Sequence, residues 1–383
     1  MKLLYIANIR IPTEKAHGHQ IMTMGEAFSL QGVDTILVVP SRKNNDFKNV
    51  NPFDFYEIKK NFKLKKILTI DPVLLLKFPA GIYIKVQSII FMFFLSWYFL
   101  FINRGDYTVY TRDEYLLPFL QIFFKRVVWE AHALPNNLNK YRKYLNRCYK
   151  VIVLTSEIKK QLTKLGINGN KVLVSPDAVD LSIFDIDIDK QEARQSLKLP
   201  ANKILLGYTG SFKTKDMDKG ISDILKALKK LPDNILLVAI GGSDIDIEFY
   251  KNIAKSLNIE NRVIWVKKVD QKTLAVYQKS FDVLLMPFPY TKHYAYYMSP
   301  LKMFEYMASK RPIVASNLPT IKEVLNENNC IFCRPDDNAD LANKINILIS
   351  NSDLAAKLSN QAYLDVKNYT WNNRAKLIID FIS

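Results

Sequence analysis

Short apolar runs that alternate with helical segments constrain the fold of this chain more than any other feature. Continuous apolar strands of about four to eight residues, separated by helices, are typical of a parallel sheet whose two faces are both covered. The pattern occurs twice. The predicted strands of the first series are 3–8, 34–40, 107–111, 126–132 and 150–155, and those of the second are 204–211, 234–242, 262–266, 282–287 and 311–316. The sequence therefore predicts an α/β fold with two doubly wound domains.

The length of the chain also favours two domains. It has 383 residues, and single hydrophobic cores usually stop growing at about 250–300 residues. We place the first domain at 1–174 and the second at 175–365. The last segment, about 366–383, is amphipathic and is predicted to pack back on the first domain.

The positive charge of the chain is unevenly distributed. The formal net charge is +17; residues 1–175 hold 26 Lys and Arg against 12 Asp and Glu, whereas the rest holds 28 against 25. Codon bias explains a lysine-rich composition but not its concentration in one half, so the first domain is expected to meet an anionic partner. No nucleic-acid motif is recognised, and the aromatic residues lie mainly in apolar runs, so nucleic acid is not predicted.

The cysteines indicate a reducing compartment. The chain has three, Cys148, Cys330 and Cys333, which is too few for a disulfide framework at this length. Cys330 and Cys333 form a C-x-x-C, but in a short strand they would point to opposite faces, so a redox or zinc role is not expected. The D-x-D patterns at 185–189 and 244–246 are interpreted as solvated linker and loop charges. No metal site is predicted.

The segment from Ile89 to Ile102 raises the question of a membrane. With residues 86–88 it approaches the lower limit of about 17 residues for a spanning helix. A basic segment, 61–68, precedes it and a predicted strand follows directly. A helix buried in the domain, or lying partly in a membrane interface, is therefore favoured over a span. The first residues lack the long apolar core of a signal peptide. We expect a cytoplasmic protein, either free or peripheral on the inner face of the plasma membrane.

The stretch SPLKMFEYMA, 299–308, predicts a helix that carries a carboxylate on or beside its apolar face. Ser299 is the expected cap and Pro300 the first helical residue. The backbone N–H groups of Leu301 and Lys302 would then be available to a diphosphate. Glu305 needs hydrogen-bond donors if it is buried, and the hydroxyl groups of a ligand would supply them.

Other candidate residues follow predicted strands, where ligands bind in open parallel sheets. Gly18 precedes a helix and would let backbone approach a ligand, and His132 would hydrogen-bond a substrate. Equally, Gly18 fits a plain loop glycine and His132 a structural histidine. The second domain offers cationic and glycine-rich turns after its strands. These candidates are Gly210, Ser211, Lys213, Lys215, Lys219, Gly241 and Gly242.

Five segments, in this order along the chain, resemble the retaining glycosyltransferases of family 4. They are 17–40, 176–184, 208–220, 262–287 and 299–316. The resemblance covers nearly the whole chain and implies a GT-B fold, in which two Rossmann-like domains face a central cleft. It also implies that the second domain binds a nucleotide sugar and the first an acceptor.

The resemblance assigns roles to individual residues. Gly18 would lie against the diphosphate and donor sugar, and His132 would contact the donor sugar near the reacting centre. Lys219 would hold the pyrophosphate in place of a metal. Glu305 matches the second glutamate of the family's E-x7-E pattern, which binds ribose. Val263 falls where the family's backbone contacts the base.

The chain departs from the family pattern at two places. Tyr297 stands where the first glutamate of E-x7-E is expected, so its contact with the donor sugar must be made otherwise or lost. Ser211 and Phe212 follow Gly210 where an arginine is usual. Lys213 or Lys215 would then supply the missing charge.

The sequence predicts a metal-independent hexosyltransferase without a cofactor. It would move a sugar from a UDP- or GDP-linked donor to a hydroxyl of a glycan or lipid-linked acceptor, in the synthesis of cell-surface polysaccharide or glycoconjugates. Its partners would be the donor, the acceptor and an anionic membrane surface. Two alternatives stay open: a nucleotide-sugar epimerase of the same architecture, and a non-catalytic protein that binds nucleic acid or membrane.

Overall fold

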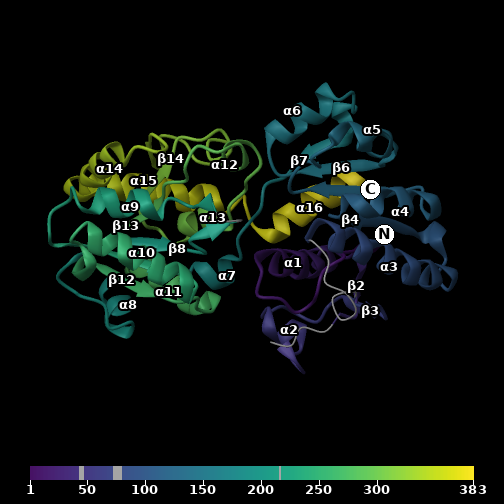
Figure 1. Ribbon diagram of the computed structural model, residues 1–383, viewed down its shortest axis with the longest axis horizontal. Helices are drawn as coiled ribbons and strands as arrows, with labels where there is room; N and C mark the ends of the chain where they lie inside the picture. Colours follow the sequence, from purple (N-terminus) through teal and green to yellow (C-terminus); the bar gives the residue numbers. More distant parts are fainter. Residues whose placement is uncertain (43–46, 72–79, 215–216) are drawn as a thin grey trace. The chain divides into compact units, whose positions relative to one another are not determined.

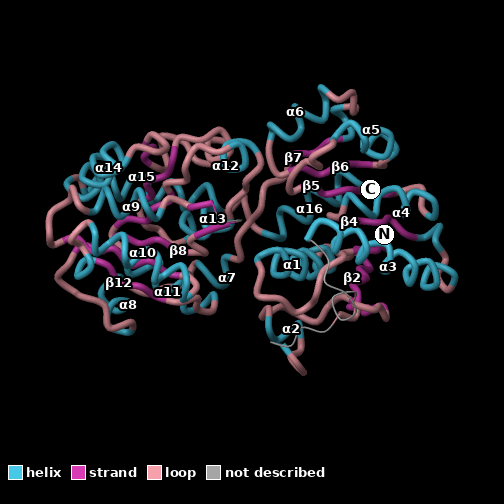
Figure 2. Tube along the Cα trace, in the orientation of Figure 1, coloured by secondary structure: helices cyan, strands magenta, loops and turns pink. Residues whose placement is uncertain are grey.

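The computed structural model describes residues 1–42, 47–71, 80–214 and 217–383, and the chain divides into two compact units. Unit 1 comprises Met1–Pro176 and Trp371–Ser383, and unit 2 comprises Asp177–Thr370. The divisions therefore fall after residues 176 and 370, where the sequence analysis places them after 174 and 365. Figure 1 labels the elements of both units, and Figure 2 shows their helices and strands in separate colours.

Unit 1 is built on a parallel sheet of seven strands in the order β3-β2-β1-β4-β5-β6-β7. The order reverses between β1 and β4, and such a switch point is where ligands bind in sheets of this kind. The strands are β1 Lys2–Ile6, β2 Asp34–Pro40, β3 Lys63–Ile67, β4 Tyr107–Thr111, β5 Val127–Ala131, β6 Lys150–Val153 and β7 Val172–Val174.

Helices cover the sheet of unit 1, and the last helix of the chain is one of them (Figure 1). The α-helices are α1 Ala16–Leu30, α2 Pro52–Phe55, α3 Ala80–Leu100, α4 Leu117–Phe123, α5 Leu138–Arg147, α6 Ser156–Lys164 and α16 Trp371–Ile382. The single 3-10 turns are η3 Arg104–Asp106, η4 Glu114–Leu116 and η5 Gly169–Lys171. The neighbours α1 and α16 pack along one another. Residues 371–383 thus complete the N-terminal unit.

Unit 2 contains a parallel sheet of six strands in the order β12-β11-β8-β13-β14-β15. Its switch point lies between β8 and β13. The strands are β8 Ile204–Thr209, β11 Ile235–Ile240, β12 Val263–Val266, β13 Val283–Met286, β14 Ile313–Ser316 and β15 Ile331–Cys333, with the short antiparallel pair β9 Lys213–Thr214 and β10 Met217–Asp218 beside them.

Two apolar clusters cover the two faces of this sheet. The helices of unit 2 are α7 Leu181–Phe184, α8 Lys190–Ser196, α9 Ile221–Leu228, α10 Asp244–Ser256, α11 Gln271–Ser280, α12 Lys292–Tyr296, α13 Leu301–Ala308, α14 Asn338–Ser350 and α15 Ser352–Val366, with the 3-10 turn η6 Glu260–Arg262. Cys330 belongs to one cluster and Cys333 to the other, and both are free thiols. The prediction that they point to opposite faces is confirmed.

Two predicted helix starts are wrong. The helix of the first domain begins at Ala16, so Gly18 lies inside its first turn rather than before it. The helix α13 begins at Leu301, with Pro300 extended at the cap position and no side-chain cap. Instead of capping, the Oγ of Ser299 accepts a hydrogen bond from the backbone N of Asp177 at 2.9 Å. A partner 122 residues away in the sequence thus replaces the local one.

Candidate functional site

Three glycines bring the ends of β8 and β11 together. Gly210 follows β8 with φ +102°, and Gly241 follows β11 with φ +106°. A Cβ on Gly241 would lie 2.8 Å from the carbonyl carbon and oxygen of Gly210, and a Cβ on Gly242 would lie 2.3 Å from the Phe212 ring. Because the Gly210 backbone and the Phe212 ring cannot move away without cost, only glycine at 241 and 242 allows the two turns to lie this close to one another. The two turns lie at the carboxyl edge of the sheet, where ligands bind in open parallel sheets.

Lys219 is held at the switch point by the glycine that follows it. Gly220 has φ +97°, and a Cβ there would lie 1.9 Å from the carbonyl oxygen of Pro287, just after β13. Lys219 Nζ donates to Ser211 Oγ at 2.8 Å. Burial lowers the pKa of Lys219 to about 8. Lys219 is therefore mostly protonated at pH 7 and loses its proton between about pH 7 and pH 9.

Lys302 places a second ammonium group against the same turn. Its Nζ lies 3.6 Å from the centroid of the Tyr208 ring, and its nearest approach to a Cβ built on Gly210 is 3.3 Å, from Cε. The residue is only 8% exposed, and its Nζ has no hydrogen-bond partner in the described part of the chain. Burial, and then the charge of Lys219, hold the pKa of Lys302 well below its usual range. A buried amine without an acceptor, beside a partly buried lysine that donates to a hydroxyl, is suited to binding an anion.

Glu305 lies one turn along α13 and finds a donor within the protein. Its Oε2 accepts from Gln278 Nε2 at 3.2 Å, and the same amide nitrogen lies 3.3 Å from Thr209 Oγ1. The buried Gln278 Oε1 has no hydrogen-bond partner in the described part of the chain. Burial raises the pKa of Glu305 to about 7. A hydrogen bond from a ligand hydroxyl would favour the ionised form of this carboxylate.

Other predicted residues of unit 2 are not gathered at this turn. Lys213 Nζ lies 3.9 Å from the centroid of the Phe249 ring on α10. Val263 begins β12, at the amino end of a parallel strand, whereas the strand's last residue, Val266, accepts a hydrogen bond from Gly241 N. Tyr297 follows α12 and is partly buried. Lys215 lies outside the described residues.

The predicted residues of unit 1 have neighbours within that unit. A Cβ on Gly18 would lie 2.4 Å from both Thr13 Cγ2 and Tyr56 Oη, so internal packing alone requires a glycine there. His132 Nε2 lies 2.8 Å from Glu130 Oε1. Neither contact involves a ligand, and both residues stay candidates.

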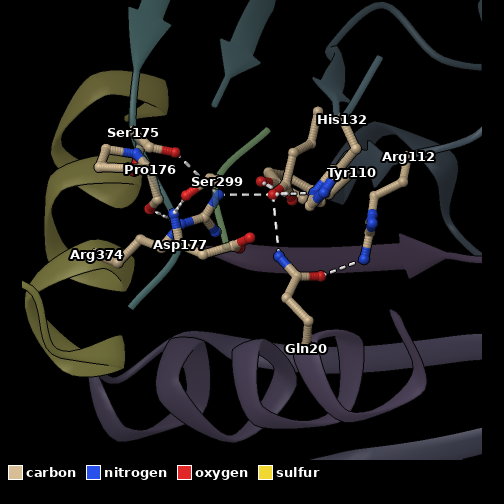
Figure 3. Close-up of polar contacts among 10 residues, drawn as sticks. Gln20, Tyr110, Arg112, His132, Ser175, Pro176, Asp177, Ser299 and Arg374 are labelled. Atoms are coloured by element: carbon tan, nitrogen blue, oxygen red, sulfur yellow. Dashed lines mark hydrogen bonds and ion pairs between the residues drawn. The ribbon is translucent and has the colours of Figure 1, made fainter. Parts of the chain in front are cut away.

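Glu130 is the centre of a buried polar cluster at the carboxyl ends of β4 and β5 (Figure 3). Its Oε1 accepts from Gln20 Nε2 at 3.1 Å and from Arg374 Nη2 at 2.6 Å, and its Oε2 accepts from Tyr110 Oη at 2.6 Å. Burial alone would raise the pKa of Glu130, but Arg374 and then His132 hold it well below its usual range. The carboxylate therefore orients His132 and fixes α16 to the sheet.

Sequence reasoning missed several of these residues. Glu130 stands inside the apolar strand VVWEA, all of whose residues are buried; a carboxylate in an apolar stretch is the signal that identified Glu305. The side chain of Lys302 was detectable in the same way, since it occupies a buried helix position. Gln278, Tyr110 and Arg374 carry no local signal, because their partners are distant in the sequence.

Comparison with known proteins identifies the kind of domain that carries this site. Residues 189–365 match the model of the family described as glycosyl transferases group 1. Most of unit 2 is therefore similar to this family. The matched residues include the glycine turns, Lys219 and Lys302.

A relative and two solved structures extend the likeness. The chain is 24% identical over 234 residues to an uncharacterised glycosyltransferase from Methanocaldococcus jannaschii, covering 59% of this chain and 57% of that relative. It therefore spans little more than half of the relative's length. Sucrose-phosphate synthase from Thermosynechococcus elongatus is similar with a TM-score of 0.79 at 19% identity, over 99% of this chain and 98% of that structure.

The second structure is Anabaena Alr3699/HepE in complex with UDP. Its TM-score is 0.73 at 14% identity, and 99% of each chain is covered. At such identities the structures report on the fold. They confirm the predicted α/β fold of two Rossmann-like domains, as in GT-B glycosyltransferases.

Proposed function

We propose that the chain is a retaining glycosyltransferase of family 4 that transfers a sugar from a UDP- or GDP-linked donor to a hydroxyl of a glycan or lipid-linked acceptor. The side-chain amines of Lys302, which is buried, and of Lys219, which is partly buried, carry this proposal. Both lie against the Gly210–Ser211 turn at the switch point of unit 2. A diphosphate would accept hydrogen bonds from both and offset the cost of their burial.

The same geometry favours departure of the diphosphate. As the bond between the anomeric carbon and the diphosphate oxygen breaks, negative charge accumulates on the leaving oxygen. Fixed cations and helix N–H groups stabilise such charge without reorganising. Lys219, Lys302 and the first turn of α13 are arranged for this role, so a metal ion is not required by the proposal.

Two further residues would bind the rest of the donor. Glu305 would accept hydrogen bonds from the ribose hydroxyls, which would favour its ionised form and lower its raised pKa. His132, oriented by Glu130, would donate to or accept from the transferred sugar. The replacement of glutamate by Tyr297 leaves the sugar itself open.

The acceptor and the pathway belong to the proposal as well. We propose a hexose donor and a glycan or lipid-linked acceptor. The basic first unit fits such an acceptor and a role in the synthesis of cell-surface polysaccharide or glycoconjugates. A cytoplasmic location fits the three free thiols. The similar structure that holds UDP makes UDP-sugars the first donors to test. The family match and the proteins named above give no support to an epimerase or a nucleic-acid-binding protein.

A donor panel tests the proposal. The purified chain is incubated with UDP-glucose, UDP-galactose, UDP-N-acetylglucosamine and GDP-mannose, and released nucleoside diphosphate is measured with and without a membrane extract as acceptor. One donor should release its diphosphate, and Lys219→Met should reduce that rate at least tenfold, while Lys213→Met should not. Release from no donor would contradict transferase activity, and conversion of the donor sugar without release would favour an epimerase.

A further inference from the structure

A row of large apolar side chains runs along the exposed face of α3. Residues spaced by three, four or seven positions lie on one side of a helix. The exposed residues with this spacing are Ile82 at 50%, Ile89 at 62%, Phe93 at 60%, Trp97 at 57% and Leu100 at 69%. We call these five residues the α3 stripe. An exposed apolar surface of this length on a soluble unit marks an interaction site.

The opposite face of α3 is fixed in the core of unit 1. Phe91, Leu95 and Phe99 are buried there. The Phe99 ring stacks on Phe119 at 5.9 Å between centroids and meets Phe124 edge-on at 4.9 Å. The α3 stripe is therefore not a second core face, because the helix already buries the other side.

Hydrogen bonds at the start of α3 also tie it to the sheet. Asn8 Nδ2 donates to Ser88 Oγ at 3.1 Å, just after β1. Tyr83 Oη donates to Asp71 Oδ1 at 3.2 Å and accepts from Gln87 Nε2 at 2.7 Å. By length and composition 82–100 could cross a membrane, and 28% of that window is buried. Crossing would require breaking these bonds and leaving polar groups in hydrocarbon.

Basic side chains lie next to this helix. The edge strand β3 packs against α3. Three of its five residues, Lys63, Lys65 and Lys66, are exposed, and Leu68 beyond it is 74% exposed. Lys85 is exposed on α3 itself. Cations beside exposed apolar residues are the composition of a surface that binds anionic lipid headgroups.

We propose that the α3 stripe inserts into the interface of a membrane that contains anionic lipids, with α3 in the plane of the membrane and the β3 lysines against the headgroups. A second copy of the chain is the less suitable occupant, because it would bring another basic surface against these lysines. The proposal concerns unit 1 and goes beyond the donor site of unit 2. It would bring the transferase to acceptors carried by lipids.

Vesicle sedimentation tests the surface. The full chain is mixed with vesicles of phosphatidylcholine alone or with about a third phosphatidylglycerol, at low salt. We expect binding to the anionic vesicles, with at least a tenfold loss for Phe93→Ser/Trp97→Ser. The matched control, Ile245→Ser/Leu364→Ser, removes two exposed apolar residues of unit 2 and should bind like the wild type. Lys63→Ser/Lys65→Ser should weaken binding to the anionic vesicles by about fivefold for each lysine.

The depth of Trp97 separates an in-plane helix from a spanning one. Phosphatidylcholine brominated near the headgroup should quench Trp97 more than phosphatidylcholine brominated near the chain ends, and the difference should vanish in Trp97→Phe. Stronger quenching by the deep bromines would overturn the in-plane orientation. The other three tryptophans stay as internal references.

Several results would overturn the proposal. Binding to neither kind of vesicle, or equal binding by the Phe93→Ser/Trp97→Ser variant, would contradict membrane insertion. A concentration-dependent dimer in sedimentation velocity that the same variant abolishes would assign the stripe to a second copy. Nucleotide binding is measured on the same preparations, so failure here is distinguishable from failure of the donor site.

Discussion

The two units bury positive charge in opposite ways. In unit 1, Arg374 donates to the Glu130 carboxylate at 2.6 Å and to the carbonyl oxygens of Pro176 and Ser175 at 2.7 and 3.2 Å. In unit 2, Lys302 Nζ is buried without a hydrogen-bond partner in the described part of the chain, and Lys219 Nζ, which is partly buried, donates to the Ser211 hydroxyl. The first cation is paired by the fold itself. Among the described residues, Lys219 and Lys302 lack such a partner carboxylate, which suits a site that binds an anionic ligand.

This difference predicts opposite effects of removing the cations. Removing a paired cation leaves its carboxylate buried and alone, and costs stability. Removing an unpartnered cation relieves a cost of burial, and loses function instead. The following predictions test each side of the comparison, beginning with the largest effect.

Arg374→Met should lower the free energy of unfolding by about 3–5 kcal/mol, because Glu130 would keep a buried charge without its main cation. Urea unfolding followed by tryptophan fluorescence measures the change. Lys376→Met, on the exposed side of the same helix, is the matched control and should change stability by less than about 0.5 kcal/mol. A loss below about 1 kcal/mol for Arg374→Met would show that the pair is not a structural requirement.

Lys219→Met should weaken the binding of the preferred nucleoside diphosphate by about 10- to 100-fold. A hydrogen bond between two charged groups contributes about 1.5–3 kcal/mol. Calorimetric titration gives the dissociation constant. Lys213→Met should stay within about twofold of the wild type, because Lys213 lies against Phe249 rather than at the turn. Equal losses of affinity in Lys219→Met and Lys213→Met would contradict a specific contact between Lys219 and the diphosphate.

Nucleoside diphosphate binding should weaken about tenfold between pH 7 and pH 9. The pKa of Lys219 is lowered to about 8, so its protonated fraction falls from about nine-tenths to about one-tenth over this range. A bound diphosphate favours the protonated form. Binding at pH 9 should therefore take up a proton, which titrations in buffers of different ionisation enthalpy detect. A flat affinity from pH 7 to pH 9 would argue against Lys219 as a contact.

Lys302→Met should raise the free energy of unfolding at pH 7 by about 1 kcal/mol or more, as happens when buried charge is replaced by an apolar side chain. The pKa of Lys302 is lower in the folded chain than in the unfolded chain. At pH values between these two pKa values unfolding takes up a proton, so the free energy of unfolding rises with pH. In Lys302→Met the free energy of unfolding should rise less with pH than in the wild type. A net loss of stability would mean that Lys302 has a structural role.

The sequence predicted most of the architecture because its signals are local. Apolar strands such as 235–240 and the turns after them identify themselves within a few residues, and the resulting edge gathers Gly210, Gly241 and Lys219. Ser299 was misread because its Oγ bonds Asp177, a contact that no local pattern shows. Val263 lies at the amino end of β12, one strand length from the carboxyl edge where the ligand is expected.

The candidate site is less predictable than the fold for the same reason. That Lys302 turns its ammonium group onto the Tyr208 ring depends on how α13 packs on β8. The link from Glu130 to Arg374 joins residues 244 positions apart. Such contacts follow from the packed unit rather than from spacing along the chain.

The central claim is that the buried Lys302 and the partly buried Lys219 bind the diphosphate of a ligand. Titration calorimetry with UDP, UMP and uridine, and with GDP and GMP, on the wild type and on Lys302→Met tests it most directly. We expect one diphosphate to bind at least tenfold more tightly than its monophosphate, and Lys302→Met to lose that preference while remaining folded. Equal affinities for diphosphate and monophosphate, or an unchanged preference in Lys302→Met, would contradict the claim.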